Sequence, residues 1–307
     1  MNIDPIFVET SNSPKREIKN ILNEEIDLHG YYCSHPFNHF EVSAEGLVWM
    51  CCPAYLPYAI GNVLEQDIEE IWNGKKAILL RKQILNGEFN YCQKQWCPAI
   101  QSKVLPKVTD FHDHELALGS VFPVQEIEYD VVNKGIWTDE SLKMPAPTNI
   151  VFCNDFSCNL WCPSCRVEKI MHTSGPIYQK AKTINDKIVK AFLTEPTDRK
   201  FIINPLGSGD IFASKVIREM LYEIDGEKFP NMQLWVMTNG IMFTEKMWKR
   251  LHKIHNNLGL FNISFDAGTK ETYEQKTRLG GNWDVLLKNC DFLNTKQDYF
   301  PQFKIAY

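Results

Sequence analysis

Three cysteines lie within eight residues near the middle of the chain, in the segment Cys158-Asn159-Leu160-Trp161-Cys162-Pro163-Ser164-Cys165. An apolar run at residues 149–153 precedes them and predicts a buried strand, and a segment with helical periodicity follows. The thiols therefore lie on a loop at the C-terminal end of a strand, where α/β proteins bind ligands. Three thiolates on one short loop can hold one metal centre, and they leave one coordination position open for a small molecule.

The spacing C-x3-C-x2-C resembles the cluster loop of the radical S-adenosylmethionine (radical SAM) enzymes. This resemblance implies that Cys158, Cys162 and Cys165 ligate a [4Fe–4S] cluster whose remaining iron binds the amino and carboxylate groups of S-adenosylmethionine. Taken alone, the spacing also fits a zinc loop or unrelated core cysteines. Many family members have an aromatic residue just before the third cysteine. Ser164 stands there in this chain, and Trp161 is the aromatic residue available in the loop.

Composition limits the class of protein. A length of 307 residues allows two domains, and 44% hydrophobic with 23% charged residues indicates a globular chain. The net charge of −5 gives no basic excess, so we expect no nucleic-acid partner. The sequence has neither a signal peptide at its start nor an apolar run of membrane-spanning length, so we expect a cytoplasmic protein without a membrane partner. In that setting ten cysteines favour metal ligation over disulfides.

A second set of cysteines lies in the first third of the chain. Residues 40–43 and 47–51 predict a β-hairpin, with Cys33 before it and Cys51 at its end. Cys52 would point to the opposite face of the strand, so we favour Cys51 as the ligand. Two amphipathic helices, predicted at 64–72 and 77–85, lead to Cys92 and Cys97. Four thiolates form a soft site that accepts zinc or an iron–sulfur cluster, and spacing does not separate the two.

This region resembles the SPASM domain, the auxiliary-cluster module of many radical SAM enzymes. The resemblance spans about residues 30–100 and is carried by Cys33-x12-Gly46-x4-Cys51, Gly61-Asn62, Ile71-Trp72-Asn73 and Cys92-x4-Cys97-Pro98. The chain has fewer cysteines than the full SPASM pattern, and the module precedes the radical SAM domain instead of following it. The resemblance therefore implies one auxiliary iron–sulfur cluster, as in the shorter twitch version. A small zinc-stapled domain is the alternative.

Strands and helices alternate in the second half of the chain. The strands are predicted at 149–153, 201–206, 232–237, 259–265 and 302–306, and the helices at 177–193, 211–224, 243–254 and 283–293. This order predicts an α/β fold with a parallel sheet and right-handed crossovers. The resemblance implies a partial (βα) barrel of the radical SAM type, preceded by a small α+β cysteine-rich SPASM-like domain.

The predicted domain organisation has four parts. They are an N-terminal extension (1–27), the SPASM/twitch-like domain (28–105), a connecting region (106–146) and the radical SAM partial barrel (147–307). The family's barrel usually has six βα units, and the last of them is absent here. We therefore expect either a shortened or fragmentary chain or a partner that covers the uncovered sheet edge.

Polar residues follow several predicted strands. Gly207-Ser208-Gly209-Asp210 resembles the Gly-Gly-Glu motif, which holds the methionine amino group in the family. Ser208 and Asp210 replace Gly and Glu, so either the shorter Asp210 reaches through a changed geometry or its role passes to backbone carbonyls. Asn239, after the third strand, stands where family members contact the ribose or carboxylate of S-adenosylmethionine. Ser264 and Asp266 are expected to share a strand face toward the cofactor. Arg278 also recurs in the resemblance, although a solvated helix-end arginine is an equal interpretation. Cys153 and Cys290 are interpreted as small buried hydrophobes.

The resemblance implies a function as well. A radical SAM enzyme cleaves S-adenosylmethionine reductively at its [4Fe–4S] cluster to a 5′-deoxyadenosyl radical, which abstracts hydrogen from the substrate. SPASM-type relatives often modify peptides or proteins, so we expect such a substrate, together with an electron donor. The alternative hypothesis is a non-catalytic iron–sulfur or zinc-binding protein, a fragment or a subunit of a larger assembly.

Overall fold

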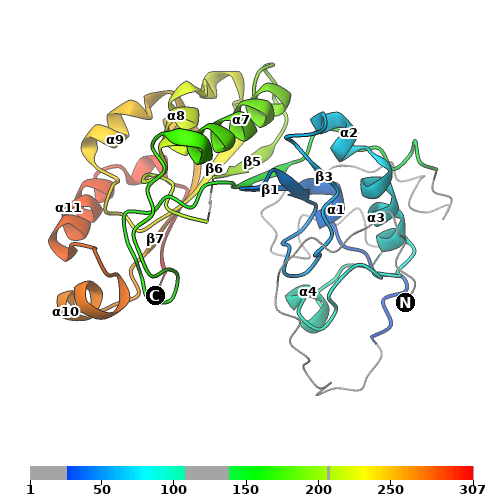
Figure 1. The fold of residues 1–307 in the computed structure, drawn as a ribbon, viewed down its shortest axis with the longest axis horizontal. Coiled ribbons are helices and arrows are strands. Elements are labelled where there is room, and N and C mark those ends of the chain that lie inside the picture. The colour runs from blue at the N-terminus through cyan, green and yellow to red at the C-terminus, as the bar shows by residue number, and fades with distance from the viewer. Residues whose placement is uncertain (1–25, 108–137, 206–207, 307) are drawn as a thin grey trace. The chain divides into compact units, whose positions relative to one another are not determined.

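The computed structural model describes residues 26–107, 138–205 and 208–306 and divides the chain into two compact units (Figure 1). The first, the cysteine-rich unit, comprises residues up to 41 and 47–148. The second, the parallel-sheet unit, comprises 42–46 and 149–307. Most of the predicted N-terminal extension and of the connecting region lies outside the described residues, as does Gly207.

The cysteine-rich unit contains the predicted hairpin and several short helices. Its strands are β1 (His39–Ser43, whose last two residues group with the other unit), β2 (Leu47–Trp49) and β3 (Gly61–Asn62). Strand β3 runs antiparallel to β2, with Leu47 opposite Asn62. Its helices are α1 (His35–Asn38), α2 (Ile68–Trp72), α3 (Lys75–Leu85) and α4 (Pro98–Gln101). Helix α2 begins four residues later than predicted, because the preceding residues form a turn in which the Asn62 side chain accepts from Leu64 N at 2.9 Å.

Arg81 is the central polar group in the core of this unit. Its side chain is fully buried, and its guanidinium carbon lies 4.5 Å from the centre of the Trp72 ring. The guanidinium donates to Pro36 O at 2.9 Å, Leu142 O at 3.0 Å and Asn73 Oδ1 at 3.2 Å. It therefore joins helix α3 to α1 and to the segment that follows residue 138.

The parallel-sheet unit confirms the predicted α/β class. Its strands lie in the order β4 (Asn149–Cys153), β5 (Phe201–Asn204), β6 (Met232–Thr238), β7 (Leu258–Ser264) and β8 (Gln302–Ala306). Each neighbouring pair is parallel. Figure 1 shows the helices that follow these strands as an arc along the sheet. They are α7 (Gly175–Phe192), α8 (Lys215–Glu223), α9 (Glu245–Arg250) and α11 (Trp283–Asn294).

Two predicted helices are shorter than their apolar periodicity suggested. Helix α8 begins at Lys215 and not at Ile211, because the Ser214 side chain caps it by accepting from Ile217 N at 3.2 Å. The helix predicted at 243–254 divides at Leu251 into α9 and a 3₁₀ segment, η3 (His252–Asn257). The Ser214 cap therefore moved the start of α8, while the order of the predicted strands and helices followed the hydrophobic pattern.

The core of the parallel-sheet unit lies between the strands and the helices. Phe261 of β7 packs against Phe212, Phe243 and Phe300, with ring centres 4.9–6.4 Å apart. Strand β8 lies at the edge of the sheet, and its Phe303 is 43% exposed. None of the helices within the described ranges has both the length and the apolar character needed to cross a membrane.

Candidate metal centres

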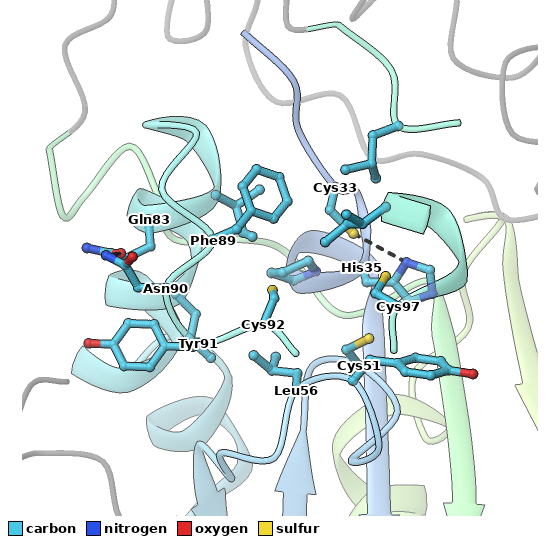
Figure 2. A pocket seen from close by; sticks show the side chains of 16 residues that line it. Cys33, His35, Cys51, Leu56, Gln83, Phe89, Asn90, Tyr91, Cys92 and Cys97 are labelled. Carbon is cyan, nitrogen blue, oxygen red and sulfur yellow. Dashed lines mark hydrogen bonds between the residues drawn. The ribbon is translucent and has the colours of Figure 1, made fainter. Parts of the chain in front are cut away.

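Four cysteines of the first unit come together at one pocket. Cys33 precedes α1, Cys51 follows β2, Cys92 follows α3 and Cys97 precedes α4. All four line the same largely apolar pocket, and Figure 2 shows their sulfur atoms directed into it. Cys52 is not among the lining residues. These four side chains, called here the auxiliary thiols, are those that the sequence predicted as a set.

The backbone explains why distant cysteines meet. The loop after β2 and the loop after α3 are joined by the Gln93 amide, which donates to Tyr55 O at 2.8 Å. Cys97 N then donates to Gln93 O at 3.1 Å, which folds the Cys92–Cys97 segment into a turn beneath that loop. The spacing of four residues between Cys92 and Cys97 is therefore the length of one hydrogen-bonded turn, with both thiols on the pocket side.

Burial raises the pKa of three of the auxiliary thiols, Cys33, Cys51 and Cys92. It raises the pKa of Cys33 to about 12, and it also raises the pKa values of Cys51 and Cys92. The nearby thiols of the set act in the same direction. Metal-free, Cys33, Cys51 and Cys92 hold their protons at neutral pH. A positively charged metal centre fits this pocket because it would replace the protons and compensate the charge of the thiolates.

His35 is a further polar residue at this pocket. Its Nδ1 lies 3.6 Å from Cys33 Sγ, and its ring lines the pocket beside the auxiliary thiols (Figure 2). Burial lowers the pKa of His35 to about 4, so the imidazole is neutral at physiological pH. His35 is not among the residues predicted from the sequence. Its position two residues after Cys33 was the available signal.

The loop of the second unit carries the other three cysteines, called here the loop thiols. Cys158, Cys162 and Cys165 follow β4 at the C-terminal edge of the parallel sheet. Cys162 is buried, Cys158 is half-buried and Cys165 is exposed. In the described ranges, no group of three or more Cys, His, Asp or Glu side chains has the arrangement of a closed metal-ion site. The shared pocket of the auxiliary thiols and the shared loop of the other three are what bring soft sulfur donors, which iron and zinc prefer, near one another.

Each loop thiol has a side-chain N–H donor beside it. Asn239 Nδ2 lies 3.8 Å from Cys158 Sγ, Arg278 Nη1 3.6 Å from Cys162 Sγ, and Arg166 Nη2 3.6 Å from Cys165 Sγ. The three donors come from three different segments of the parallel-sheet unit. Donors to sulfur stabilise a thiolate, so this arrangement suits metal-bound cysteines.

One flank of the loop is held by residues near the end of the described chain. Trp161 N donates to Leu279 O at 3.0 Å. A Cβ atom on Gly280 would stand 2.3 Å from the Trp161 ring, so only glycine allows the ring to lie there. Trp161, the aromatic residue available in this loop, is therefore packed against the Leu279–Gly280 backbone.

The other flank is held by the segment after β5. Arg166 donates to Ser208 O at 2.7 Å and to Phe156 O at 2.6 Å, so it links this segment to the loop that carries the loop thiols, called here the cluster loop. A Cβ atom on Gly209 would lie 2.1 Å from Ser157 O. Glycine is therefore required at this position for close approach of two backbones, and the motif packs directly against the residue before Cys158. Gly207, the first residue of the predicted motif, lies outside the described residues.

Asp210 and Asn239 lie next to each other beneath the loop. The Asp210 carboxylate is 4% exposed and accepts from Asn239 N at 2.7 Å and from the Thr238 hydroxyl at 2.8 Å. Burial raises the pKa of Asp210, and its hydrogen bonds act in the opposite direction. Asn239 uses its own side chain to reach Cys158 and Asn159.

Ser264 and Asp266 do not continue one strand face. Strand β7 ends at the half-buried Ser264, and Asp266 has a φ of 54°, in the left-handed region. The alternation that predicted a shared face stops between them. Asp266 Oδ2 instead lies 2.6 Å from Arg278 Nη2, and the Arg278 side chain is only 15% exposed. Arg278 does follow the last residue of a helical segment, η4 (Tyr273–Thr277), but the interpretation of it as solvated is wrong.

Asp155 anchors the start of the loop, and sequence reasoning missed it. Its buried carboxylate accepts from the amide and hydroxyl of Ser157 and from the Ser214 hydroxyl at 2.6 Å. A carboxylate between a buried strand and a cysteine loop was the available signal. Arg166 was missed for a different reason, since its partners Phe156 O and Ser208 O are backbone atoms that leave no mark in the sequence.

The auxiliary thiols are four soft sulfur donors that line one pocket, and four thiolates together are the type of ligand set that holds zinc or an iron–sulfur cluster. Residues 33–98 match the model of the SPASM family, described as an iron–sulfur cluster-binding domain. The match begins at Cys33 and extends just past Cys97, so it contains all four auxiliary thiols. It indicates iron–sulfur cluster binding, by a domain that occurs in radical SAM proteins. A comparison with curated proteins gave no match to the chain.

Proposed function

We propose that the chain is a radical SAM enzyme with one auxiliary iron–sulfur cluster. The loop thiols would hold a [4Fe–4S] cluster with one iron open to S-adenosylmethionine, and the auxiliary thiols would hold the second cluster. The observation that carries this proposal is the presence of three thiols, each beside an N–H donor, on one loop at the C-terminal edge of a parallel sheet. The SPASM match supports it, because that domain occurs in radical SAM proteins.

The chain's own residues would prepare the site. When bound, the cluster and S-adenosylmethionine supply one-electron reduction and hydrogen abstraction by a 5′-deoxyadenosyl radical. Asn239, Arg166 and Arg278 would stabilise the thiolates by N–H donation. Asp155 and Gly209 would fix the entry of the loop, and Trp161 would fix its far side. The parallel sheet would form part of the family's (βα) barrel.

Metal and product analysis tests this proposal. Protein purified and reconstituted without oxygen is expected to contain iron and sulfide and to release 5′-deoxyadenosine from S-adenosylmethionine under a strong reductant. Cys158→Ala should abolish release, whereas Cys153→Ala, which alters a cysteine outside both sets, should leave it intact. Zinc without sulfide at both sites would exclude the proposal. Iron–sulfur clusters without any 5′-deoxyadenosine would favour the alternative, a non-catalytic cluster-binding protein.

The class of substrate forms the second part of the proposal. We expect a peptide or protein substrate, because SPASM-containing relatives often act on such molecules. Deuterated peptides and deuterated small metabolites, separated by size from the same cells, can be offered in parallel to the reconstituted protein. Deuterium in 5′-deoxyadenosine only from the peptide fraction would support this substrate class, and deuterium only from the small metabolites would contradict it.

A further inference from the structure

The carboxylate of Asp210 has no acceptor position left for a ligand. Its Oδ1 accepts from Phe212 N at 3.0 Å and Ala213 N at 3.1 Å. Its Oδ2 accepts from the Thr238 hydroxyl at 2.8 Å and from Asn239 N at 2.7 Å. An ionised carboxylate offers about four lone-pair sites, and here four donors of the protein occupy them. The side chain is also buried, which removes it from any solvent-accessible ligand.

These bonds join segments that surround the cluster loop. Phe212 and Ala213 follow β5, whereas Thr238 and Asn239 end and follow β6. The backbone of Asp210 adds a third connection, because its amide donates to Ser157 O at 2.8 Å. One buried residue therefore ties together the ends of two strands and the residue that precedes Cys158.

Asn239 extends this connection to the sulfur. Its backbone amide is held by Asp210, and its side-chain Oδ1 accepts from Ile241 N at 3.1 Å, which fixes the direction of the amide group. The Nδ2 atom then donates to Asn159 Oδ1 at 3.0 Å and lies 3.8 Å from Cys158 Sγ. The path from Asp210 to Cys158 consists of short contacts between groups that are buried or half-buried.

We infer that Asp210 is a positioning residue, which holds Asn239 and through it the Cys158 side of the cluster loop, and that its carboxylate does not bind the amino group of S-adenosylmethionine. This inference rests on the proposed function for the identity of the ligand. Of the two alternatives that the resemblance to the Gly-Gly-Glu motif left open, it favours the one in which the role passes from the Asp210 side chain to other acceptors. The ammonium group must then use acceptors other than the Asp210 carboxylate.

A thermodynamic cycle separates positioning from direct contact. The affinity of the reconstituted, oxidised protein is measured for S-adenosylmethionine and for its analogue without the amino group, in the wild type and in Asp210→Asn. Positioning predicts that the substitution weakens both ligands by the same factor. If Asp210 contacts the ammonium group, the substitution should weaken S-adenosylmethionine but leave the affinity of the analogue unchanged. Such a result would overturn the inference.

A second measurement does not depend on any ligand. In the metal-free protein, the alkylation rate of each cysteine is followed by mass spectrometry. Thr238→Val is included in case Asp210→Asn does not fold, because it removes one hydrogen bond of this path and keeps the Asn239 donor beside Cys158 Sγ. Loss of one hydrogen bond on this path should raise the rate at Cys158 roughly two- to tenfold, with the rate at Cys92 unchanged. Asp186→Asn, at an exposed carboxylate of α7, is the matched control.

The two measurements distinguish failure of the proposed function from failure of the positioning role. If the wild-type protein binds no S-adenosylmethionine, the proposed function is wrong, while the Cys158 rates still report on positioning. If the Cys158 rate stays at the wild-type value in folded Asp210→Asn and Thr238→Val, the positioning role is wrong, whatever the ligand is.

Discussion

Single atoms decide where the cluster loop can lie. Gly209 and Gly280 are positions at which a Cβ atom would collide with the loop, at Ser157 O and at the Trp161 ring. Both glycines lie far from the loop in the sequence, so the loop's shape is set by tertiary contacts. The role of the three cysteines as a possible ligand set could be predicted from their spacing, because few residue types act as metal ligands. The groups that hold the loop in place could not be predicted, because they are backbone carbonyls and glycines, which carry no recognisable side-chain pattern.

Gly209→Ala tests this requirement for close approach. The added methyl would stand 2.1 Å from Ser157 O, a backbone atom that cannot move without shifting the loop. We expect a loss of about 1–3 kcal/mol in the free energy of unfolding of the metal-free protein, typical of overpacking. Urea denaturation followed by circular dichroism measures it. Gly268→Ala is the control, because a Cβ there meets nothing within 4 Å, and equal effects of the two substitutions would contradict the explanation.

Elements were predicted more reliably than their ends. All five strands of the parallel-sheet unit lie within two residues of their predicted bounds. Short apolar runs between turn residues are typical of buried strands, so the pattern fixes both their type and their position. Helix starts were less accurate, since they depend on caps such as Ser214 that compete with the hydrophobic pattern. Helix α3 was placed by its apolar residues, yet its most connected side chain is a buried arginine that no periodicity indicates.

Arg81→Met tests how α3 is anchored. Methionine would keep the apolar stem but leave Pro36 O, Leu142 O and Asn73 Oδ1 without this donor. We expect a loss of about 3–5 kcal/mol in the free energy of unfolding, the cost of removing one partner from a buried charged network. Chemical denaturation, followed by a probe in the cysteine-rich unit, gives the value. Lys82→Met, at the exposed next position, should change stability by less than about 0.5 kcal/mol. A similarly small effect at Arg81 would refute the role.

At the scale of the whole molecule, the cysteine sets belong to separate compact units. The auxiliary thiols lie in the first unit and the loop thiols in the second, so neither set shares a residue with the other. Loss of one centre should therefore leave the ligands of the other unchanged.

Iron stoichiometry in paired variants checks this independence. If both clusters are [4Fe–4S], the reconstituted wild type should contain about eight iron atoms per chain. Cys162→Ala and Cys92→Ala should each retain about four, and the double variant should retain almost none. Cys52→Ala is the control for the auxiliary site and should keep the full content. A single variant that loses all its iron would show that the two centres depend on each other.

The contact between Trp161 and the Leu279–Gly280 backbone also sets an order of events on the ribosome. The segment with the loop thiols emerges long before Leu279 is synthesised, so the nascent loop has neither its far flank nor its donors Asn239 and Arg278. The auxiliary thiols all precede residue 98, and their unit can close while the rest is still being translated. We therefore expect the auxiliary centre to be loaded first and the open-site cluster to be inserted only after Leu279 has left the ribosome.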